Sequence, residues 1–290
     1  MSPERKIYLV TGCSAGLGYC LCKAILAAGH GLIATSRSPS KTPEKVAEIE
    51  SLGGKWAQLD VTSPSVSQQF ADAVKIYGRV DVLVNNAGIA MAATIEDADL
   101  DGVRRVYETN VFGLMRMCQL AVPLMRAQLP SGGGGTIVNV SSAGAFFCVP
   151  MVWAYHSSKA AVDVFTESLR NEVAPFGIRV LMAQPGGIRT GFVGNSSKTE
   201  MSEAYKGTPA EYVLDALTKG AGSERIDPEK CALRIVEAVD GTGMMEGVEE
   251  LGFRIPLGSE AVALIQGRVE ELTSTLKKHE KTSLSVDYEE

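Results

Sequence analysis

The side chains of Tyr155 and Lys159 have the types and the spacing that suit proton transfer. A free tyrosine has a pKa of about 10, so its phenol is a poor acid or base at neutral pH. Residues four apart on a helix share a face, and the ammonium of Lys159 can therefore approach the phenol and favour the phenolate. Tyr19 and Lys23 have the same spacing, so such a pair alone does not identify a catalytic site.

A second chemical signal is the glycine-rich run Thr11–Gly18, which follows an apolar run and precedes a helical stretch that extends to Ala28. Glycines allow the backbone to turn tightly and to approach a pyrophosphate, while the N-terminus of the next helix offers N–H groups to it. The spacing is G-x-x-x-G-x-G. A plain glycine turn is the alternative, but the position between a strand and a helix favours a dinucleotide site.

The end of the next apolar run indicates which dinucleotide is preferred. An acidic residue about 20 positions after the glycines would bind the ribose hydroxyls of NAD, whereas an arginine would accept the 2′-phosphate of NADP. This chain has Thr35-Ser36-Arg37-Ser38 there and no acid. Arg37 could be an ordinary surface arginine, but the missing carboxylate argues independently for NADP(H) over NAD(H).

Two further polar sites follow predicted strands. Asp60 and Val61 end the third apolar run, and Asn85–Gly88 ends the fourth. Ligands bind at the carboxyl ends of strands in open α/β sheets, so these residues are expected beside the cofactor. A turn is the alternative for both, because Asp60 can cap a helix, and Asn and Gly both tolerate a left-handed backbone.

The elements that must position these residues are seven short apolar runs separated by helical stretches. Runs of Val, Ile and Leu that alternate with helices are typical of a parallel sheet covered on both faces. We therefore predict an α/β fold with a Rossmann-type, doubly wound, mainly parallel seven-stranded sheet, in a single domain over residues 1–290. The predicted strands are residues 6–10, 31–36, 55–60, 80–84, 136–140, 178–183 and 251–255.

Three segments around this sheet have predictions of their own. Residues from about 189 to 225 are rich in Ser, Thr and Gly, and we expect them to form a mobile lid over a substrate. A helical apolar period predicts a C-terminal helix at about 259–278, followed by a loose polar tail from residue 282. Apolar residues of a helix at about 100–128 could pack on the sheet or on a second subunit, and we expect a homodimer or homotetramer.

Composition excludes several classes of protein. The net charge is −6, with no basic excess to neutralise phosphates, so neither a nucleic acid nor an anionic membrane is expected as a partner. There is no run of 18 apolar residues, and no membrane span is expected. The six cysteines lack paired spacing and none of the three histidines lies near one, which favours a cytoplasmic protein with reduced thiols and no metal site.

Taken together, the motifs resemble those of the short-chain dehydrogenase/reductase family in its compact single-domain form, from residue 6 to about residue 255. Each motif is a modest signal by itself, but in this order and spacing they are highly specific. The motifs are Thr11–Gly18, Asp60-Val61, Asn85–Gly88, Asn110, Ser142, Tyr155 with Lys159, and Pro185–Thr190.

The resemblance implies four catalytic residues. Tyr155 would give or take the proton, and Lys159 would lower the pKa of Tyr155 and bind the nicotinamide ribose. Ser142 would hydrogen-bond the substrate oxygen, and Asn110 would help to hold a water molecule in a proton relay. A strand-end cap is the alternative for Ser142, and a helix kink is the alternative for Asn110.

The resemblance also implies a set of residues that contact the cofactor. Most of them come from turns at the carboxyl ends of the predicted strands. They are Gly12, Ser14, Gly16, Leu17, Gly18, Arg37, Asp60, Val61, Asn86, Ala87, Gly88, Tyr155, Lys159, Pro185, Gly186, Ile188 and Thr190.

The substrate pocket is expected to be apolar. Residues 143–154, which form one pocket wall in the family, include three aromatic residues and no Arg or Lys that could bind a carboxylate or phosphate. At least one of Phe146 and Phe147 is expected in the core, and His156 is expected to point away from the site. The predicted pocket residues are Ser142, Gly144, Phe147, Val149, Trp153, Gly187 and Phe192.

These features predict an NADP(H)-dependent oxidoreductase that reduces a carbonyl, or oxidises the corresponding secondary alcohol, on a hydrophobic small molecule. An NAD-dependent alcohol dehydrogenase of the same family is one alternative. A catalytically silent NADP-sensing protein is another, although the complete set of four catalytic residues argues against it.

Overall fold

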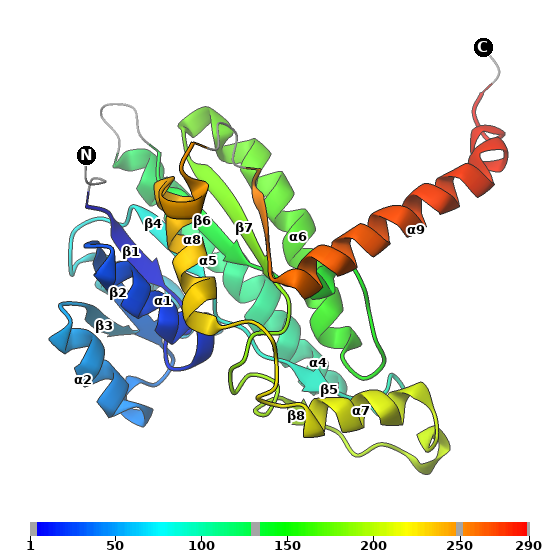
Figure 1. Cartoon of the computed structure of the whole chain (residues 1–290). Helices are drawn as coiled ribbons and strands as arrows, with labels where there is room; N and C mark the ends of the chain where they lie inside the picture. The colour runs from blue at the N-terminus through cyan, green and yellow to red at the C-terminus, as the bar shows by residue number, and fades with distance from the viewer. Residues whose placement is uncertain (1–4, 129–133, 248–251, 289–290) are drawn as a thin grey trace.

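The structure is a computed structural model that describes residues 5–128, 134–247 and 252–288. Seven strands form one sheet in the order β3-β2-β1-β4-β6-β7-β9, every neighbouring pair is parallel, and helices cover both faces (Figure 1). This confirms the predicted doubly wound sheet. The strands are β1 (Ile7–Val10), β2 (Gly31–Ser36), β3 (Lys55–Gln58), β4 (Val82–Asn85), β6 (Thr136–Val140), β7 (Arg179–Pro185) and β9 (Arg254–Leu257).

Side chains of each central strand alternate between two hydrophobic cores. In β1, Tyr8 and Val10 pack on the face covered by α1 and α8, whereas Ile7 and Leu9 pack on the face covered by α3, α5 and α6. Both faces are buried, which explains why β1, β4 and β6 contain continuous apolar runs. The helices are α1 (Gly16–Ala27), α2 (Pro43–Ser51), α3 (Val66–Val74), α5 (Leu114–Ala127), α6 (Trp153–Val173) and α8 (Pro228–Asp240).

The strand order determines where a ligand can bind. The chain moves outward from β1 through β2 to β3, and then returns to the other side of β1 to form β4. Connections that leave β1 and β4 in opposite directions open a crevice at the carboxyl ends of these two strands. The glycine-rich run Thr11–Gly18 and the run Asn86–Gly88 both lie at this crevice.

The long helix predicted from about residue 100 to 128 is interrupted. It consists of α4 (Leu100–Tyr107), a π-helical turn (Glu108–Gly113) and α5. The side chain of Asn110, within the turn, hydrogen-bonds to residues outside the helix. A wider turn that holds a side chain in tertiary contacts is typical of functional sites.

The segment expected to be a lid contains a short strand and a helix. Strand β8 (Ser197–Lys198) pairs with β5 (Met91–Ala92) in a separate two-stranded sheet, and α7 (Pro209–Lys219) follows. Apolar residues of α7 pack on Met151, just before α6. The lid segment is therefore anchored beside the N-terminus of the helix that contains Tyr155 and Lys159.

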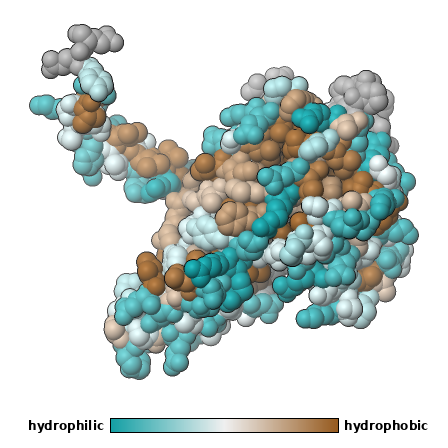
Figure 2. Space-filling view, turned by 180° about the vertical axis from the view of Figure 1, so that it is seen from behind, coloured by the Kyte–Doolittle hydropathy of each residue, from teal (hydrophilic) through white to brown (hydrophobic). Residues whose placement is uncertain are grey.

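The C-terminal helix is longer than predicted. Helix α9 (Ser259–Leu284) extends through residues 282–284, which were expected to be loose, and it projects from the body of the molecule (Figure 1). Figure 2 shows apolar residues along its exposed length. In the seventh predicted strand, residue 251 lies outside the described residues, and β9 starts three residues later, at Arg254.

Candidate active site

The turn between β1 and α1 has room only for glycine at two of its positions. Gly12 has φ +74°, and a Cβ there would lie 2.8 Å from the Cα of Ala87. A Cβ on Gly18 would overlap the carbonyl oxygen of Gly12 and lie 2.5 Å from Nδ2 of Asn86. The first turn of α1 can therefore approach the strand ends closely, as a pyrophosphate site requires.

Residues of the β4 turn hold the glycine turn in place. The Thr11 hydroxyl accepts hydrogen bonds from the backbone N–H groups of Asn86 and Ala87, both at 3.0 Å. Nδ2 of Asn86 donates to the carbonyl oxygens of Thr11, at 2.9 Å, and Gly12, at 3.2 Å. The side chain of Asn86 is thus a brace for the predicted cofactor site, and Thr11, which was not among the predicted contacts, is its partner.

Two cationic side chains, Arg37 and Lys45, follow β2 in the chain. Arg37 is exposed at the end of β2 and makes no hydrogen bond or ion pair within the described ranges. Nζ of Lys45, on α2, donates to the carbonyl oxygen of Ser14 at 2.9 Å. Sequence reasoning missed Lys45, because no spacing rule relates a lysine on α2 to the glycine turn.

The residues after β3 have structural contacts of their own. Oδ1 of Asp60 accepts hydrogen bonds from the backbone N–H and the hydroxyl of Thr62. The side chain of Val61 is buried in the hydrophobic core, and so is that of Leu17 in α1. Asp60 therefore shapes the turn, as its alternative interpretation predicts, and Val61 and Leu17 can contact a cofactor only through their backbones.

Tyr155 and Lys159 share a face of α6, as predicted. Nζ of Lys159 lies 5.7 Å from the centre of the Tyr155 ring and donates to the carbonyl oxygen of Val140 at 2.8 Å. Lys159 is only 4% exposed. The ammonium is therefore fixed between α6 and the end of β6.

Burial dominates the acidity of both groups. It raises the pKa of Tyr155 to about 12, against a lowering by the hydrogen bond from Ser142. Burial lowers the pKa of Lys159 to about 8, although the negative charge of Asp163 acts in the opposite direction and raises it. The direction for Tyr155 is opposite to the one expected from Lys159, because desolvation of the phenolate outweighs the hydrogen bond from Ser142.

Ser142 and Asn110 hold the backbone around this pair. Oγ of Ser142 accepts from the N–H of Gly144 at 3.0 Å, which makes the serine a cap at the end of β6. Oδ1 of Asn110 accepts from the N–H of Ile89 at 2.8 Å, and Nδ2 donates to the carbonyl oxygen of Ile89 and to the hydroxyl of Ser158. Asn110 therefore ties the β4 turn to α6.

The turn after β7 reaches the glycine turn from the other side. A Cβ on Gly16 would lie 3.4 Å from the side chain of Thr190. The N–H of Gly187 donates to Oε2 of Glu260, the second residue of α9, at 2.8 Å. The side chain of Ile188 packs against the core formed with α1 and α8. Residues 185–190 thus join the glycine turn at one site.

Aromatic side chains surround Tyr155, although not all of the predicted ones. The Phe192 ring centre lies 5.5 Å from that of Tyr155. Trp153 packs instead with Met91 and Val106, because residues two apart on a helix point in nearly opposite directions.

The side chain of His156 does not point away from the site, contrary to what the sequence suggested. Its ring centre lies 5.8 Å from that of Tyr155 and 5.0 Å from that of Phe147, so the imidazole lies beside the expected pocket. A Cβ on Gly144 would lie 2.7 Å from the same imidazole. Burial lowers the pKa of His156, which favours the neutral ring. Val149, also predicted in the pocket, is half-buried in the same segment.

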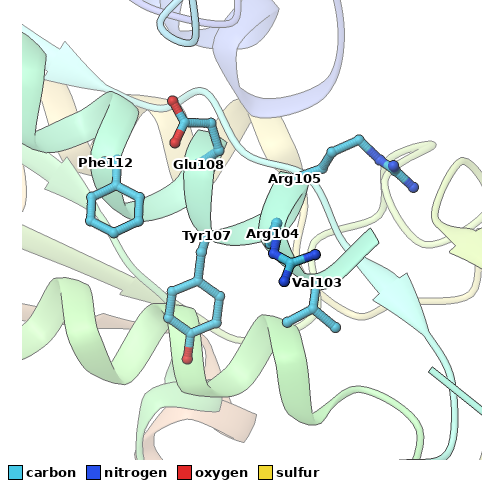
Figure 3. A pocket seen from close by; sticks show the side chains of 6 residues that line it. All are labelled: Val103, Arg104, Arg105, Tyr107, Glu108 and Phe112. Carbon is cyan, nitrogen blue, oxygen red and sulfur yellow. The ribbon is translucent and has the colours of Figure 1, made fainter. Parts of the chain in front are cut away.

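A separate hollow of about 470 Å³ opens at the start of the π-helical turn (Figure 3). Tyr107 crosses it towards α6 and donates to the hydroxyl of Ser157 at 2.9 Å. None of the predicted site residues lines this hollow, so it is not the predicted substrate pocket. The lining residues are Val103, Arg104, Arg105, Tyr107, Glu108 and Phe112.

The described residues offer neither a membrane-spanning helix nor a cluster of metal-binding side chains. No helix in these ranges is long and apolar enough to cross a membrane. The same ranges contain no group of three or more His, Cys, Asp or Glu side chains that could hold a metal ion. All six cysteines are free; four are buried, Cys20 is half-buried and Cys148 is exposed.

Comparison with known proteins identifies the family. The short chain dehydrogenase family model matches residues 6–201. An oxidoreductase of Botryotinia fuckeliana is 34% identical over 97% of this chain and 98% of its own. A short-chain dehydrogenase structure from Streptomyces avermitilis, 34% identical, covers 99% of this chain and 100% of its own with a TM-score of 0.84. From its family match and from these two relatives, the chain belongs to the short-chain dehydrogenase family of oxidoreductases.

Proposed function

We propose that this oxidoreductase uses NADP(H) to reduce a carbonyl, or to oxidise the corresponding secondary alcohol, on a hydrophobic small molecule. The observation that carries the proposal is the position of Gly88, at the cofactor turn. A Cβ on Gly88 would lie 3.8 Å from Nζ of Lys159 and 3.4 Å from Oδ1 of Asn110. Two of the proposed catalytic side chains therefore reach the turn where the nicotinamide ribose would bind.

The proposed mechanism assigns proton transfer to Tyr155. A bound nicotinamide cofactor supplies or accepts the hydride. Tyr155 donates its phenolic proton to the carbonyl oxygen, and the ammonium of Lys159 stabilises the resulting phenolate and binds the ribose hydroxyls. Ser142 donates a hydrogen bond to the same substrate oxygen. Lys159 then returns a proton to the phenolate of Tyr155, and Asn110 holds a water molecule that reprotonates Lys159.

The residues at the crevice fit a dinucleotide. Gly12, Gly16 and Gly18 keep the turn packed closely against neighbouring residues, which places the N-terminus of α1 at the crevice where a pyrophosphate would bind. The exposed guanidinium of Arg37 is free to accept a 2′-phosphate, and no carboxylate follows β2 to bind the ribose hydroxyls of NAD. Two solved relatives leave the preference open, because one from Burkholderia phymatum is in complex with NAD and one from Burkholderia cenocepacia is in complex with NADP.

The substrate would bind over the phenol of Tyr155. Phe192, which lies in the lid segment of about 189–225, supplies apolar surface beside the Tyr155 ring, and Phe147 supplies it beside the neighbouring ring of His156. An aromatic or alicyclic ketone matches this surface better than a sugar phosphate does, because no Arg or Lys occurs in the wall segment 143–154.

A direct assay tests the proposal. Oxidation of NADPH and of NADH by the purified protein is measured with a panel of aromatic and alicyclic ketones. We expect turnover with NADPH, and a lower kcat/KM with NADH. Tight binding of NADPH without turnover across the whole panel would contradict the proposal and favour a cofactor sensor.

A further inference from the structure

A buried carboxylate lies one helical turn after Lys159. Asp163 is only 6% exposed, and it packs on the inner face of α6. Both carboxylate oxygens of Asp163 accept hydrogen bonds. The hydroxyl of Ser141 donates to Oδ1, and two other groups donate to Oδ2. These are Nε2 of Gln184, at 2.6 Å, and a guanidinium nitrogen of Arg254, at 2.9 Å.

The three donors lie in or directly after three different strands. Ser141 directly follows β6 and precedes Ser142, Gln184 lies in β7 next to Pro185, and Arg254 begins β9. Asp163 therefore fastens the helix with Tyr155 and Lys159 to the strand ends that present the proposed substrate and cofactor contacts. None of the motifs found in the sequence contains it.

An apolar residue at position 163 would avoid the free-energy cost of burying a carboxylate. Burying a carboxylate is unfavourable unless it is paired and hydrogen-bonded, and replacing a buried polar network by well-packed apolar groups is often neutral or stabilising. A role of the Asp163 carboxylate in the reaction would explain why a charged residue is buried there. The charge lies on the same helix face as Lys159, whose ammonium is itself buried and hydrogen-bonded to Val140, the neighbour of Ser141.

We propose that Asp163 is a positioning residue, which keeps Lys159 protonated and holds α6 in place against the ends of β6 and β7. The inference rests on the proposed function, because it concerns the lysine assigned to the reaction. Other charged or titratable groups at this place are Tyr155 and Glu167 on α6 and Arg254 on β9, whereas β6 and β7 contribute the uncharged Ser141 and Gln184.

The sign of the expected pH effect follows from the charges. Burial already lowers the pKa of Lys159 to about 8, and the charge of Asp163 opposes this lowering. Without that charge, the pKa of Lys159 falls further and the ammonium is lost at a lower pH. Carbonyl reduction that needs the ammonium must then decline at a lower pH.

The variant Asp163→Asn tests the inference in the full chain. We expect the alkaline limb of the kcat profile for ketone reduction to move by about one unit towards lower pH, with little change in the KM for the ketone. The matched control is Glu167→Gln, which removes the other carboxylate bonded to Arg254, at 3.3 Å, and should leave the profile unchanged. Asp163→Glu retains the charge and should restore most of the wild-type profile.

A titration independent of turnover separates the two proposals. The ammonium of Lys159 is followed by NMR in protein with labelled lysines, with the Lys159→Arg spectrum as the assignment. We expect a protonated Lys159 at pH 7 in the wild type and a lower pKa in Asp163→Asn. A neutral Lys159 at pH 7 in the wild type overturns the inference even if the variant does not fold.

The remaining outcomes are also decisive. An unchanged titration and an unchanged kcat profile in folded Asp163→Asn overturn the inference while leaving the proposed function intact. No turnover in the wild type, together with the expected shift of Lys159, overturns the proposed function and supports the role of Asp163.

Discussion

Helices α6 and α9 are the two longest in the described chain, and they differ in almost every physical respect. Helix α6 lies against the sheet and buries hydrogen-bonded polar side chains, among them Ser158, Lys159 and Thr166. Helix α9 projects from the body, and Ala261 is its only buried residue among those described (Figure 1). Helix α6 thus has buried polar side chains, whereas α9 has exposed apolar side chains.

The difference teaches that apolar periodicity does not by itself locate a packed helix. Val269, Leu272 and Leu276 recur at the spacing of a packed helix face, yet all three are exposed. In α6, by contrast, the buried polar residues include the proposed catalytic Lys159, and buried polar groups generally need hydrogen-bond partners. The predictions below test this contrast, from the largest expected effect to the smallest.

The variant Tyr155→Phe should lower kcat for ketone reduction by about 10²- to 10⁴-fold, because it removes the proposed proton donor. The phenyl ring can retain its packing against Phe192, so the melting temperature should change little. Steady-state kinetics and thermal unfolding measure the two effects. A variant with more than a tenth of the wild-type kcat would show that another group transfers the proton.

Two leucine variants compare the helices directly. Leu169→Ala on α6, where the side chain is 7% exposed, should lower the free energy of unfolding by about 2–4 kcal/mol through loss of packing and creation of a cavity. Leu276→Ala on α9, where it is 71% exposed, should change it by less than about 0.5 kcal/mol. Urea unfolding measures both values, and equal losses would mean that the exposed face of α9 is covered in solution.

The variant Arg37→Asp should weaken NADPH binding by about 10- to 100-fold, the worth of a lost charge-assisted hydrogen bond. Binding of NADH should improve, because a carboxylate after β2 can bind ribose hydroxyls. Fluorescence titration with each cofactor provides the measurement, and exposed Arg79→Asp, far along the chain, is the control. Unchanged affinity for NADPH would remove Arg37 from the proposed phosphate site.

The variant Gly267→Ala should slow hydrogen exchange of α9 amides by about 2- to 5-fold, because alanine stabilises an exposed helix by about 0.5–1 kcal/mol over glycine. Nothing lies within 4 Å of a Cβ at this position. The same change at Gly18, where a Cβ would overlap the Gly12 carbonyl oxygen, should instead destabilise the fold. Faster exchange in Gly267→Ala would contradict an exposed, unpartnered α9.

The sheet and the main site could be read from local patterns in the sequence. Continuous apolar runs predicted the strands, and the glycine spacing between β1 and α1 predicted a turn that the structure shows to be sterically restricted to glycine at Gly12 and Gly18. The shared helix face of Tyr155 and Lys159 also follows from spacing alone. These features depend on residues that are close together along the chain.

What sequence reasoning missed depends on distant partners. The π-helical turn holds Asn110, whose partners Ile89 and Ser158 are 21 and 48 residues away. The carboxylate of Asp163 accepts a hydrogen bond from Arg254, which is 91 residues away. Periodicity gives no information about such pairs. The sequence also suggested that His156 points away from the site, whereas its ring lies beside Tyr155 and Phe147.

The brace between Thr11 and Asn86 has a thermodynamic consequence for cofactor recognition. Because hydrogen bonds within the chain already fix the glycine turn, the entropy lost in ordering that loop belongs to folding and not to binding. A cofactor that meets a preorganised turn retains more of its contact energy as affinity. Loosening the brace should therefore weaken cofactor binding through added disorder of the free protein, even where every direct contact with the pyrophosphate is preserved.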